Sequence, residues 1–312
     1  MNERQRLLSE RLAEYKTQTG REICAHFDRA LSECSSFRIG GKAECAVYPV
    51  NREELFYVWE AARDAGMPVF VAGNASNILF DDEGYHGAVI FTGGMRTVQA
   101  DPDGNTVSAD AGAMLSSVAA CAQRAGIAGI EYLHGIPGTL GGGIYMNCGA
   151  FGGQISENLT SCTYLDTASG NIVTESADRL GFGYRRSVFM DGGRIILSAV
   201  LHGESGDADE IKRQMDEHMA YRTGTQPLEF PSAGSVFKRY PGYYTSRLIE
   251  EAGLKGRAVG GAEVSLKHAG FIINRGGATA ADVRALIEII KQEIYRVNGI
   301  HIECEIIFAP TC

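Results

Sequence analysis

The segment of this chain best suited to chemistry runs from Gly135 to Gly153 and is dense in glycine. An interior glycine costs a helix or strand roughly 0.5–1 kcal/mol relative to alanine, so we do not expect a core element there. Glycine instead permits positive φ and lets the main chain approach a ligand without a Cβ in the way. The segment is therefore predicted to present bare N–H groups to a large anion. Its glycines are Gly135, Gly138, Gly141, Gly142, Gly143, Gly149, Gly152 and Gly153.

A second glycine-bearing loop, Gly73 to Asn77, follows a predicted strand at 69–72. Its Gly, Asn and Ser residues suit consecutive N–H groups turned toward a phosphate, although an ordinary polar turn has the same composition. The chain lacks both the G-x-G-x-x-G and the Walker A patterns. Two such loops without these motifs indicate a dinucleotide held by a fold other than the Rossmann fold.

The composition is that of a globular protein with a substantial core. The chain has 312 residues, of which 45% are hydrophobic and 21% charged, enough for two or three domains. Its net charge of −9 argues against nucleic-acid binding, which requires a basic face. We find no signal-peptide pattern and no long apolar run, and therefore expect a cytoplasmic protein without membrane insertion. The eight cysteines show no C-x-x-C spacing and no grouping with histidine, which predicts reduced thiols and no metal site.

Three blocks of predicted structure position the two loops and indicate an α+β protein. Residues 1–94 hold a short N-terminal amphipathic helix, a helix at 52–65 and strands at 67–72 and 88–92. Residues 95–205 hold strands separated by turns, a spacing typical of an antiparallel sheet, and a helix at 114–125. Residues 206–312 hold helices at 207–221, 248–252 and 279–297 and strands at 270–273 and 302–308. The helix at 279–297 carries an apolar stripe that we interpret as core, formed by Val283, Leu286, Ile287, Ile290, Ile294 and Val297.

Motifs along nearly the whole chain resemble those of the UDP-N-acetylenolpyruvoylglucosamine reductase (MurB) family. The first are Ser36-Phe37-Arg38-Ile39-Gly40-Gly41, the Gly73–Leu79 loop, and Gly-x-Pro-Gly-x-x-Gly-Gly from Gly135 followed by Asn147-x-Gly149-Ala150. The third block adds runs in the same order: Pro231–Lys238, Leu248–Gly256, Gly260–Ser265 and Lys267–Phe271.

The resemblance implies a flavoenzyme of peptidoglycan precursor synthesis. Residues 1–94 and 95–205 would form the two α+β subdomains of a vanillyl-alcohol-oxidase (PCMH) type FAD-binding fold, and 206–312 a C-terminal α+β substrate domain. NADPH would reduce a non-covalent FAD, whose N5 would pass hydride to C3 of UDP-N-acetylglucosamine enolpyruvate before C2 is protonated, giving UDP-N-acetylmuramate. The cofactor would contact Gly73, Asn74, Ala75, Ser76, Asn77, Gly135, Ile136, Pro137, Gly138, Gly141, Gly142, Asn147, Gly149 and Ala150.

Three catalytic residues follow from the same resemblance. Ser235 matches the proton donor, a role a weakly acidic hydroxyl can fill only against a strongly basic enolate, and Ser232 is its local rival. Arg185 matches an active-site arginine that would hold the substrate carboxylate and stabilise enolate charge. Glu305 matches the family's glutamate. Strand alternation places Glu303 and Glu305 on one face, which by itself is typical of a solvated edge.

The resemblance also implies substrate contacts, and the chain departs from the family there. Tyr184, Lys238, Lys267 and His268 fall in motifs assigned to substrate binding. The long tyrosine-bearing loop that caps the substrate in many relatives has no counterpart, which places the chain among the shorter, type II enzymes. Thr225 stands where many relatives carry a lysine, so a phosphate contact from that position is either lost or taken over by another cation, such as Lys238 or Arg247.

Two other functions share parts of this pattern. A different flavin oxidase of the superfamily, acting on an alcohol or amine, would be favoured by covalent flavin attachment through His134 or Cys148. A binding module that has lost catalysis would not retain Arg185, Ser235 and Glu305 together. We expect the partners to be the nucleotide sugar and NADPH, and the protein to be a monomer or a weak homo-oligomer.

Overall fold

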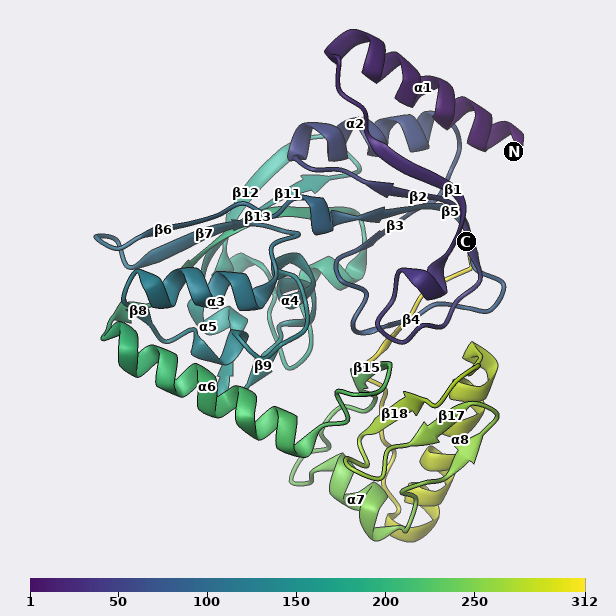
Figure 1. Ribbon diagram of the computed structural model, residues 1–312, viewed down its shortest axis with the longest axis vertical. Helices are drawn as coiled ribbons and strands as arrows, with labels where there is room; N and C mark the ends of the chain where they lie inside the picture. The colour runs from purple at the N-terminus through teal and green to yellow at the C-terminus, as the bar shows by residue number, and fades with distance from the viewer. Residues whose placement is uncertain (312) are drawn as a thin grey trace. The chain divides into compact units, whose positions relative to one another are not determined.

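The computed structural model describes residues 1–311. The chain forms two compact units, each assembled from separated segments (Figure 1). The first unit comprises 1–26, 46–74 and 89–222, and the second comprises 27–45, 75–88 and 223–312. Because these segments alternate along the chain, the units do not follow three consecutive ranges, and the predicted division at 94 and 205 stays a prediction. None of the helices within 1–311 is long and apolar enough to cross a bilayer.

A five-stranded antiparallel sheet dominates the first unit, as the turn spacing predicted. Its strands lie in the order β12-β11-β13-β7-β6. From Leu197 to Leu201, residues of β13 alternate between buried and half-buried, because one face packs on the core and the other is partly solvated. The strands are β6 (Val98–Asp101), β7 (Thr106–Asp110), β11 (Leu159–Asp166), β12 (Ile172–Ser176) and β13 (Arg194–His202).

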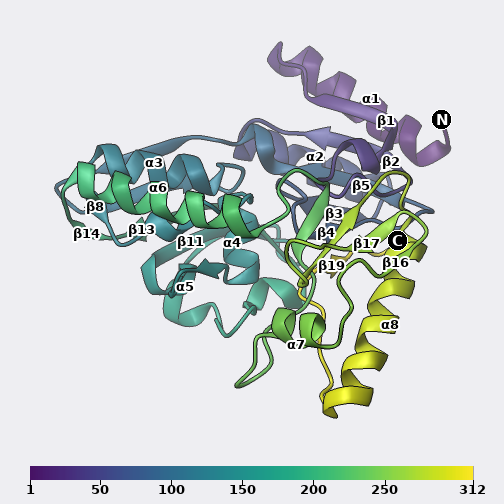
Figure 2. The ribbon, with the colours of Figure 1, turned by 60° about the horizontal axis from the view of Figure 1, so that its bottom comes forward.

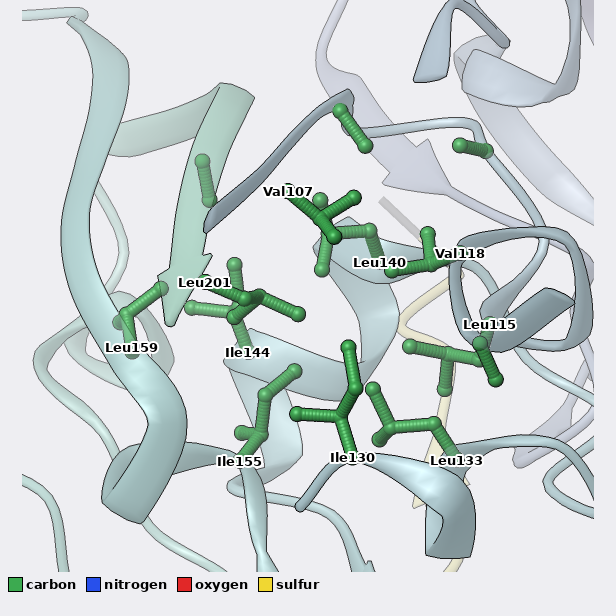
Figure 3. Close-up of a cluster of buried hydrophobic side chains, with 14 of the residues drawn as sticks. Val107, Leu115, Val118, Ile130, Leu133, Leu140, Ile144, Ile155, Leu159 and Leu201 are labelled. Atoms are coloured by element: carbon green, nitrogen blue, oxygen red, sulfur yellow. The ribbon is translucent and has the colours of Figure 1, made fainter. Parts of the chain in front are cut away.

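Two helices, α3 (Leu115–Arg124) and α4 (Leu140–Met146), build the core beside this sheet. Figure 3 shows Leu115 and Val118 of α3 and Leu140 and Ile144 of α4 pointing into one cluster with Val107 and Leu201 from the strands. All six are at most 1% exposed. The cluster fixes α4, and therefore the glycine-dense segment, against a rigid scaffold.

Helices α1 (Glu3–Thr19) and α2 (Arg52–Asp64) run side by side in the first unit, where the Tyr15 and Tyr57 rings meet at 4.8 Å (Figure 1). Both begin at an asparagine whose side chain accepts a main-chain N–H, an arrangement that starts a helix. A four-stranded sheet has the order β1-β2-β5-β3. Its strands are β1 (Cys24–Ala30), β2 (Lys42–Tyr48), β3 (Val69–Ala72) and β5 (Tyr85–Phe91).

The second unit contains the antiparallel sheet β15-β18-β17-β16 and two helices (Figures 1 and 2). Helix α8 (Ala280–Asn298) packs on β16 and β17 through the predicted apolar stripe, except that Val297 is 50% exposed. Thr279 caps its N-terminus. The other elements are α7 (Thr245–Glu251), β15 (Ser232–Ser235), β16 (Ala258–Val259), β17 (Ala262–Val264) and β18 (Phe271–Asn274).

The C-terminal strand predicted over 302–308 is largely absent. Only β19 (Ile307–Phe308) is regular, because its partner in the parallel pair, β4 (Ile78–Leu79), is itself only two residues long. The predicted alternation nevertheless holds. Ile302 and Ile306 are buried in the core, and Cys304 and Phe308 pack against it, while Glu303 is exposed and Glu305 is half-buried.

The remaining elements are short, apart from one long helix. Figure 1 shows that helix, α6, in green. These elements are α5 (Ile155–Asn158), α6 (Ala208–Thr225), β8 (Ile127–Ala128), β9 (Gly149–Ala150), β10 (Gly153–Gln154) and β14 (Glu204–Ser205).

Candidate functional site

The two predicted glycine-bearing loops contact each other in the first unit. A Cβ built on Gly73 would lie 2.1 Å from the Thr139 hydroxyl oxygen, so a glycine is required for the loops to approach this closely. The Asn74 side-chain amide donates to the Pro137 carbonyl oxygen at 2.9 Å. Residues 73–74 are thereby held against residues 137–139.

The loop part of the glycine-dense segment keeps main-chain donors available. Within residues 1–311, the amides of Gly135 and Gly138 have no acceptor in the protein, whereas Ile136 N–H donates to Leu133. Pro137 carries no N–H. Two unpaired amides beside a second polar loop can bind an anionic ligand, and the predicted cofactor contacts stay a prediction.

The second part of the segment differs from the prediction, because Leu140–Met146 is a helix and not an open loop. The amides of Leu140 and Gly141 donate to Ala113 and Ala111 at 2.8 Å, so they are not bare. Gly141 and Gly143 are buried, and a Cβ on Gly141 would lie 3.0 Å from that of Ala111. Glycine here permits close packing of a helix, which explains why a core element accepts this density.

Asn147 ends α4 and connects three segments of the first unit. Its φ of 43° is left-handed, a conformation that asparagine tolerates better than most residues. Its buried side chain donates to the Gly183 carbonyl at 2.8 Å and accepts the Ser156 N–H at 3.1 Å. The predicted cofactor residue Asn147 is therefore also a structural anchor for the turn that bears Arg185.

Arg185 lies at the tip of a tight turn, between Gly183 and Arg186, which exchange two main-chain hydrogen bonds. Its φ is 52°, an uncommon value for a non-glycine residue and one found often at functional sites. The guanidinium donates to the carbonyls of Asn147 and Gly149 at 3.3 Å each. Arg185 is therefore attached to the glycine-dense segment, whereas Arg186 turns to the exposed Asp191.

Ser235 and Glu305 belong to adjacent segments of the second unit. Residues 235–238 lie between β18 on one side and 303–305 on the other. Ser235 pairs with Phe271, and the Glu305 N–H donates to the Val236 carbonyl at 2.7 Å. The Ser235 hydroxyl donates to Phe237 at 3.4 Å, a long and weak bond. Ser235 thus has a fixed backbone and a hydroxyl proton that is loosely held.

Residues 75–77 of the Gly73–Asn77 loop contact this same cluster within the second unit. The Asn77 side chain donates to the Glu305 carbonyl at 3.2 Å, and its own carbonyl accepts the Ile307 N–H at 2.8 Å. The Ser36 hydroxyl donates to the Ser232 carbonyl at 2.7 Å and lies 3.4 Å from that of Ala75. A Cβ on Gly234 would lie 3.9 Å from the Ser76 carbonyl oxygen. Segments far apart in sequence therefore surround Ser235 and Glu305.

The predicted substrate residues lie in both units. Tyr184 is exposed in the first unit, with the Arg185 guanidinium 5.1 Å from its ring centroid. In the second unit Lys238 pairs with Glu303 at 3.0 Å, and Lys267 donates to the Thr223 carbonyl at 2.7 Å. Burial lowers the pKa of His268, whose Nδ1 accepts the Gly270 N–H at 3.1 Å, so this ring is held neutral.

Sequence reasoning missed two residues of this region, Thr139 and Arg222. Thr139 caps α4 and contacts Gly73, and a Thr followed by an apolar residue is a recognisable helix start. Arg222 lies on α6, and its Cδ would be 2.5 Å from a Cβ on Gly135. Nothing in the local sequence separates Arg222 from a surface arginine.

Of the residues offered for covalent flavin attachment, His134 precedes the glycine-dense segment directly and Cys148 lies within it. The His134 N–H donates to Glu131, while its buried Nδ1 has no hydrogen-bond partner within residues 1–311. The Cys148 N–H donates to Gly143. In the described part of the chain, no group of three or more His, Cys, Asp or Glu side chains could hold a metal ion.

Two protein-family models match separate ranges of this chain. Residues 43–176 match the model of an FAD binding domain, and residues 226–309 match the model described as "UDP-N-acetylenolpyruvoylglucosamine reductase, C-terminal domain". Two curated proteins called UDP-N-acetylenolpyruvoylglucosamine reductase are similar over 88% of this chain. The one from Clostridium novyi is 41% identical (89% of its length) and the one from Pediococcus pentosaceus 43% (91%). The crystal structure of the Thermus caldophilus reductase (MurB) has a TM-score of 0.77 and 34% identity, and covers 93% of this chain and 99% of its own.

The FAD-binding fold and the interlocked loops define a flavoprotein, an FAD-dependent oxidoreductase. The close approach at Gly73 and the unpaired amides of Gly135 and Gly138 fit such a cofactor. More particularly, the chain belongs to the UDP-N-acetylenolpyruvoylglucosamine reductase family, which confirms the resemblance seen in its motifs. The predicted α+β architecture, an FAD-binding fold followed by a C-terminal substrate domain, is confirmed with it.

Proposed function

We propose that the protein reduces UDP-N-acetylglucosamine enolpyruvate to UDP-N-acetylmuramate with NADPH, as a cytoplasmic step of peptidoglycan precursor synthesis. Membership of the reductase family supports the substrate. The match of residues 226–309 to the reductase's own C-terminal domain favours this reaction over that of an alcohol or amine oxidase. NADPH as the reductant and a monomeric or weakly associated state belong to the same proposal.

One observation carries the assignment: Arg185 and Glu305 are each hydrogen-bonded to a proposed cofactor loop within their own unit, and Ser235 lies next to the segment of Glu305. Arg185 donates to Asn147 and Gly149. Glu305 is bonded through its main chain to Asn77 and to Val236, the residue after Ser235. Such rigid attachment is what a reaction requires when its groups must meet a bound flavin in a defined geometry.

The side chains would then divide the work. The bound FAD supplies the hydride acceptor and donor chemistry. Arg185 would hold the substrate carboxylate and stabilise the charge that develops on it, since a guanidinium recognises a carboxylate through two parallel hydrogen bonds. Ser235 would give its proton to C2, and its weak bond to the Phe237 carbonyl leaves that proton available. Glu305 would complete the site beside Ser235.

Spectroscopy and turnover together test the reaction. The purified protein is expected to be yellow and to release its flavin in acid. It should oxidise NADPH rapidly only when UDP-N-acetylglucosamine enolpyruvate is present. A flavoprotein whose NADPH oxidation does not depend on this substrate would contradict the proposal.

Ser235→Ala separates the two half-reactions. Flavin reduction by NADPH should stay near normal, and product formation should fall by about 10²–10⁴-fold, the usual contribution of a positioned acid. Ser232→Ala is the matched control, because Ser232 is the neighbouring hydroxyl and its carbonyl, not its side chain, accepts from Ser36. An equal loss in both half-reactions would show that Ser235 is not the proton donor.

A further inference from the structure

Two side chains of helix α6, His218 and Arg222, lie one turn apart and contact the glycine-dense segment. The His218 ring stacks flat on Phe151, with 3.9 Å between the ring centroids and 4° between the planes. Arg222 is four residues further on and therefore shares that face of the helix. Its Cδ and Nε would lie 2.5 and 3.3 Å from a Cβ on Gly135. The last turns of α6 thus contact the glycine-dense segment on both sides of α4, at Gly135 before it and at Phe151 after it.

Arg222 is a half-buried cation without a protein partner. Within residues 1–311 it makes no hydrogen bond and no ion pair. Burial lowers the pKa of its guanidinium, which means that the charged form is poorly solvated there. Arg213, on the same helix, is instead exposed and paired with Glu210 and Glu217. Burying a charge without a partner costs free energy. A protein therefore keeps such an arginine where a ligand of opposite charge pairs with it.

We propose that Arg222 binds the pyrophosphate of FAD, an inference that rests on the proposed cofactor site at Gly135 and Gly138. The Arg222 stem contacts Gly135, whose amide has no acceptor within residues 1–311, and the second such amide, on Gly138, lies three residues further along the same loop, so donors and positive charge share one short segment. Arg222 lies outside the matched FAD-binding region, 43–176, and also precedes the reductase C-terminal region, 226–309. It is nevertheless in the first unit with the glycine-dense segment, which favours FAD over the nucleotide sugar as its ligand.

Gly135 explains why the helix can supply this cation. Any side chain at position 135 would occupy the place of the Arg222 stem, so the glycine there serves the arginine as well as the main chain. In a chain of net charge −9, a local guanidinium also offsets the unfavourable field that an incoming pyrophosphate meets. Arginine, unlike lysine, can contact two phosphate oxygens at once.

Rebinding of FAD to flavin-free protein tests the proposal. We compare wild type, Arg222→Gln, Arg222→Lys and, as the matched control on the same helix, Arg213→Gln. Arg222→Gln should weaken FAD binding at least tenfold, and Arg222→Lys should recover part of the loss. The dissociation constant should also depend less on NaCl between 50 and 500 mM in Arg222→Gln than in wild type, because one ionic contact is gone.

Thermal unfolding without flavin separates binding from packing. Arg222→Gln should be at least as stable as wild type without FAD, because the buried charge is removed, yet FAD should raise its Tm less. Lower stability of the flavin-free variant, a loss of affinity below tenfold, or an unchanged salt dependence would overturn the proposal. Wild type that binds FAD but does not oxidise NADPH with the substrate would contradict the proposed function and leave this inference standing.

Discussion

Residues 135–146 of the glycine-dense segment divide into a first half, 135–139, and a second half, 140–146, which use glycine for opposite purposes. In 135–139, Gly135 and Gly138 leave their amides unpaired, and Gly135 makes room for the Arg222 stem. In 140–146, Gly141 and Gly143 are buried in α4, and the amide of Gly141 is already bonded to Ala111. Glycine in the first half leaves main-chain donors available to a ligand, and glycine in the second half serves packing.

This difference gives the segment a rigid support next to a polar surface. Helix α4 is part of the core shown in Figure 3, so the loop that precedes it is held at a fixed point. Thr139 is the boundary, because its hydroxyl caps α4 and also contacts Gly73 of the other loop. Substitutions before Thr139 should therefore mainly weaken FAD binding, and substitutions after it should mainly lower stability.

Gly73→Ala should have the largest effect, since it acts on both halves at once. The new Cβ would lie 2.1 Å from the hydroxyl of Thr139, a buried residue that cannot move aside. Loss of the cap costs about 0.5–2 kcal/mol and overpacking about 1–3 kcal/mol, so unfolding should be easier by roughly 2–4 kcal/mol. FAD affinity should fall as well. Chemical denaturation and flavin titration measure the two effects.

Thr139→Ala, introduced into the Gly73→Ala background, provides the control. It removes the clashing oxygen, so part of the flavin affinity should return even though the cap stays lost. If Gly73→Ala binds FAD and unfolds like wild type, the two loops do not depend on this contact, and the role of Thr139 as a boundary is wrong.

Gly141→Val should disturb packing and leave the loop intact. Its Cβ would already be 3.0 Å from that of Ala111, a residue fixed by main-chain bonds to Leu197 and to Gly141 itself. We expect about 1–3 kcal/mol of destabilisation, measured by denaturant unfolding of the flavin-free protein. Gly142→Val places the same side chain where the nearest atom is 3.5 Å away and should cost clearly less. Equal destabilisation by Gly141→Val and Gly142→Val would mean that the low helix propensity of valine, and not packing against Ala111, sets the loss of stability.

The sequence predicted the sheets and long helices well, because their signals are local and repeated. The stripe of α8 and the turn-separated strands β6, β7, β11, β12 and β13 are examples. Helix α4 could not be predicted, since its glycines oppose a helix locally and tertiary contacts, such as those of Gly141 with Ala111 and of Gly143 with Leu115, hold it in the core. The strand at 302–308 failed for the same reason, because its length depends on a distant two-residue partner.

The candidate site divides in the same way. Glycine-rich loops can be recognised from local composition, and both glycine-bearing loops were predicted in this way. Ser235 could be chosen over Ser232 only by its place in the family's motif, and its role remains a prediction. Arg222 could not be predicted from the sequence. It stands out because its half-buried guanidinium has no hydrogen-bond or ion-pair partner within residues 1–311, which only the three-dimensional structure shows.

Gly142→Ala should have the smallest effect and the opposite sign. Gly142 is exposed in the first turn of α4, and its nearest neighbour would be the Thr139 hydroxyl at 3.5 Å, an ordinary contact. Alanine favours a helix over glycine by about 0.8–1.0 kcal/mol, so the flavin-free protein should become more stable by roughly that amount.

If Gly142 approaches the cofactor as the motif implies, FAD affinity should decrease in the same variant. Unfolding and flavin titration of one protein thus decide whether Gly142 belongs to the packing half or the ligand half. A stabilised variant with unchanged FAD affinity would place it with Gly141, and a destabilised one would contradict the division.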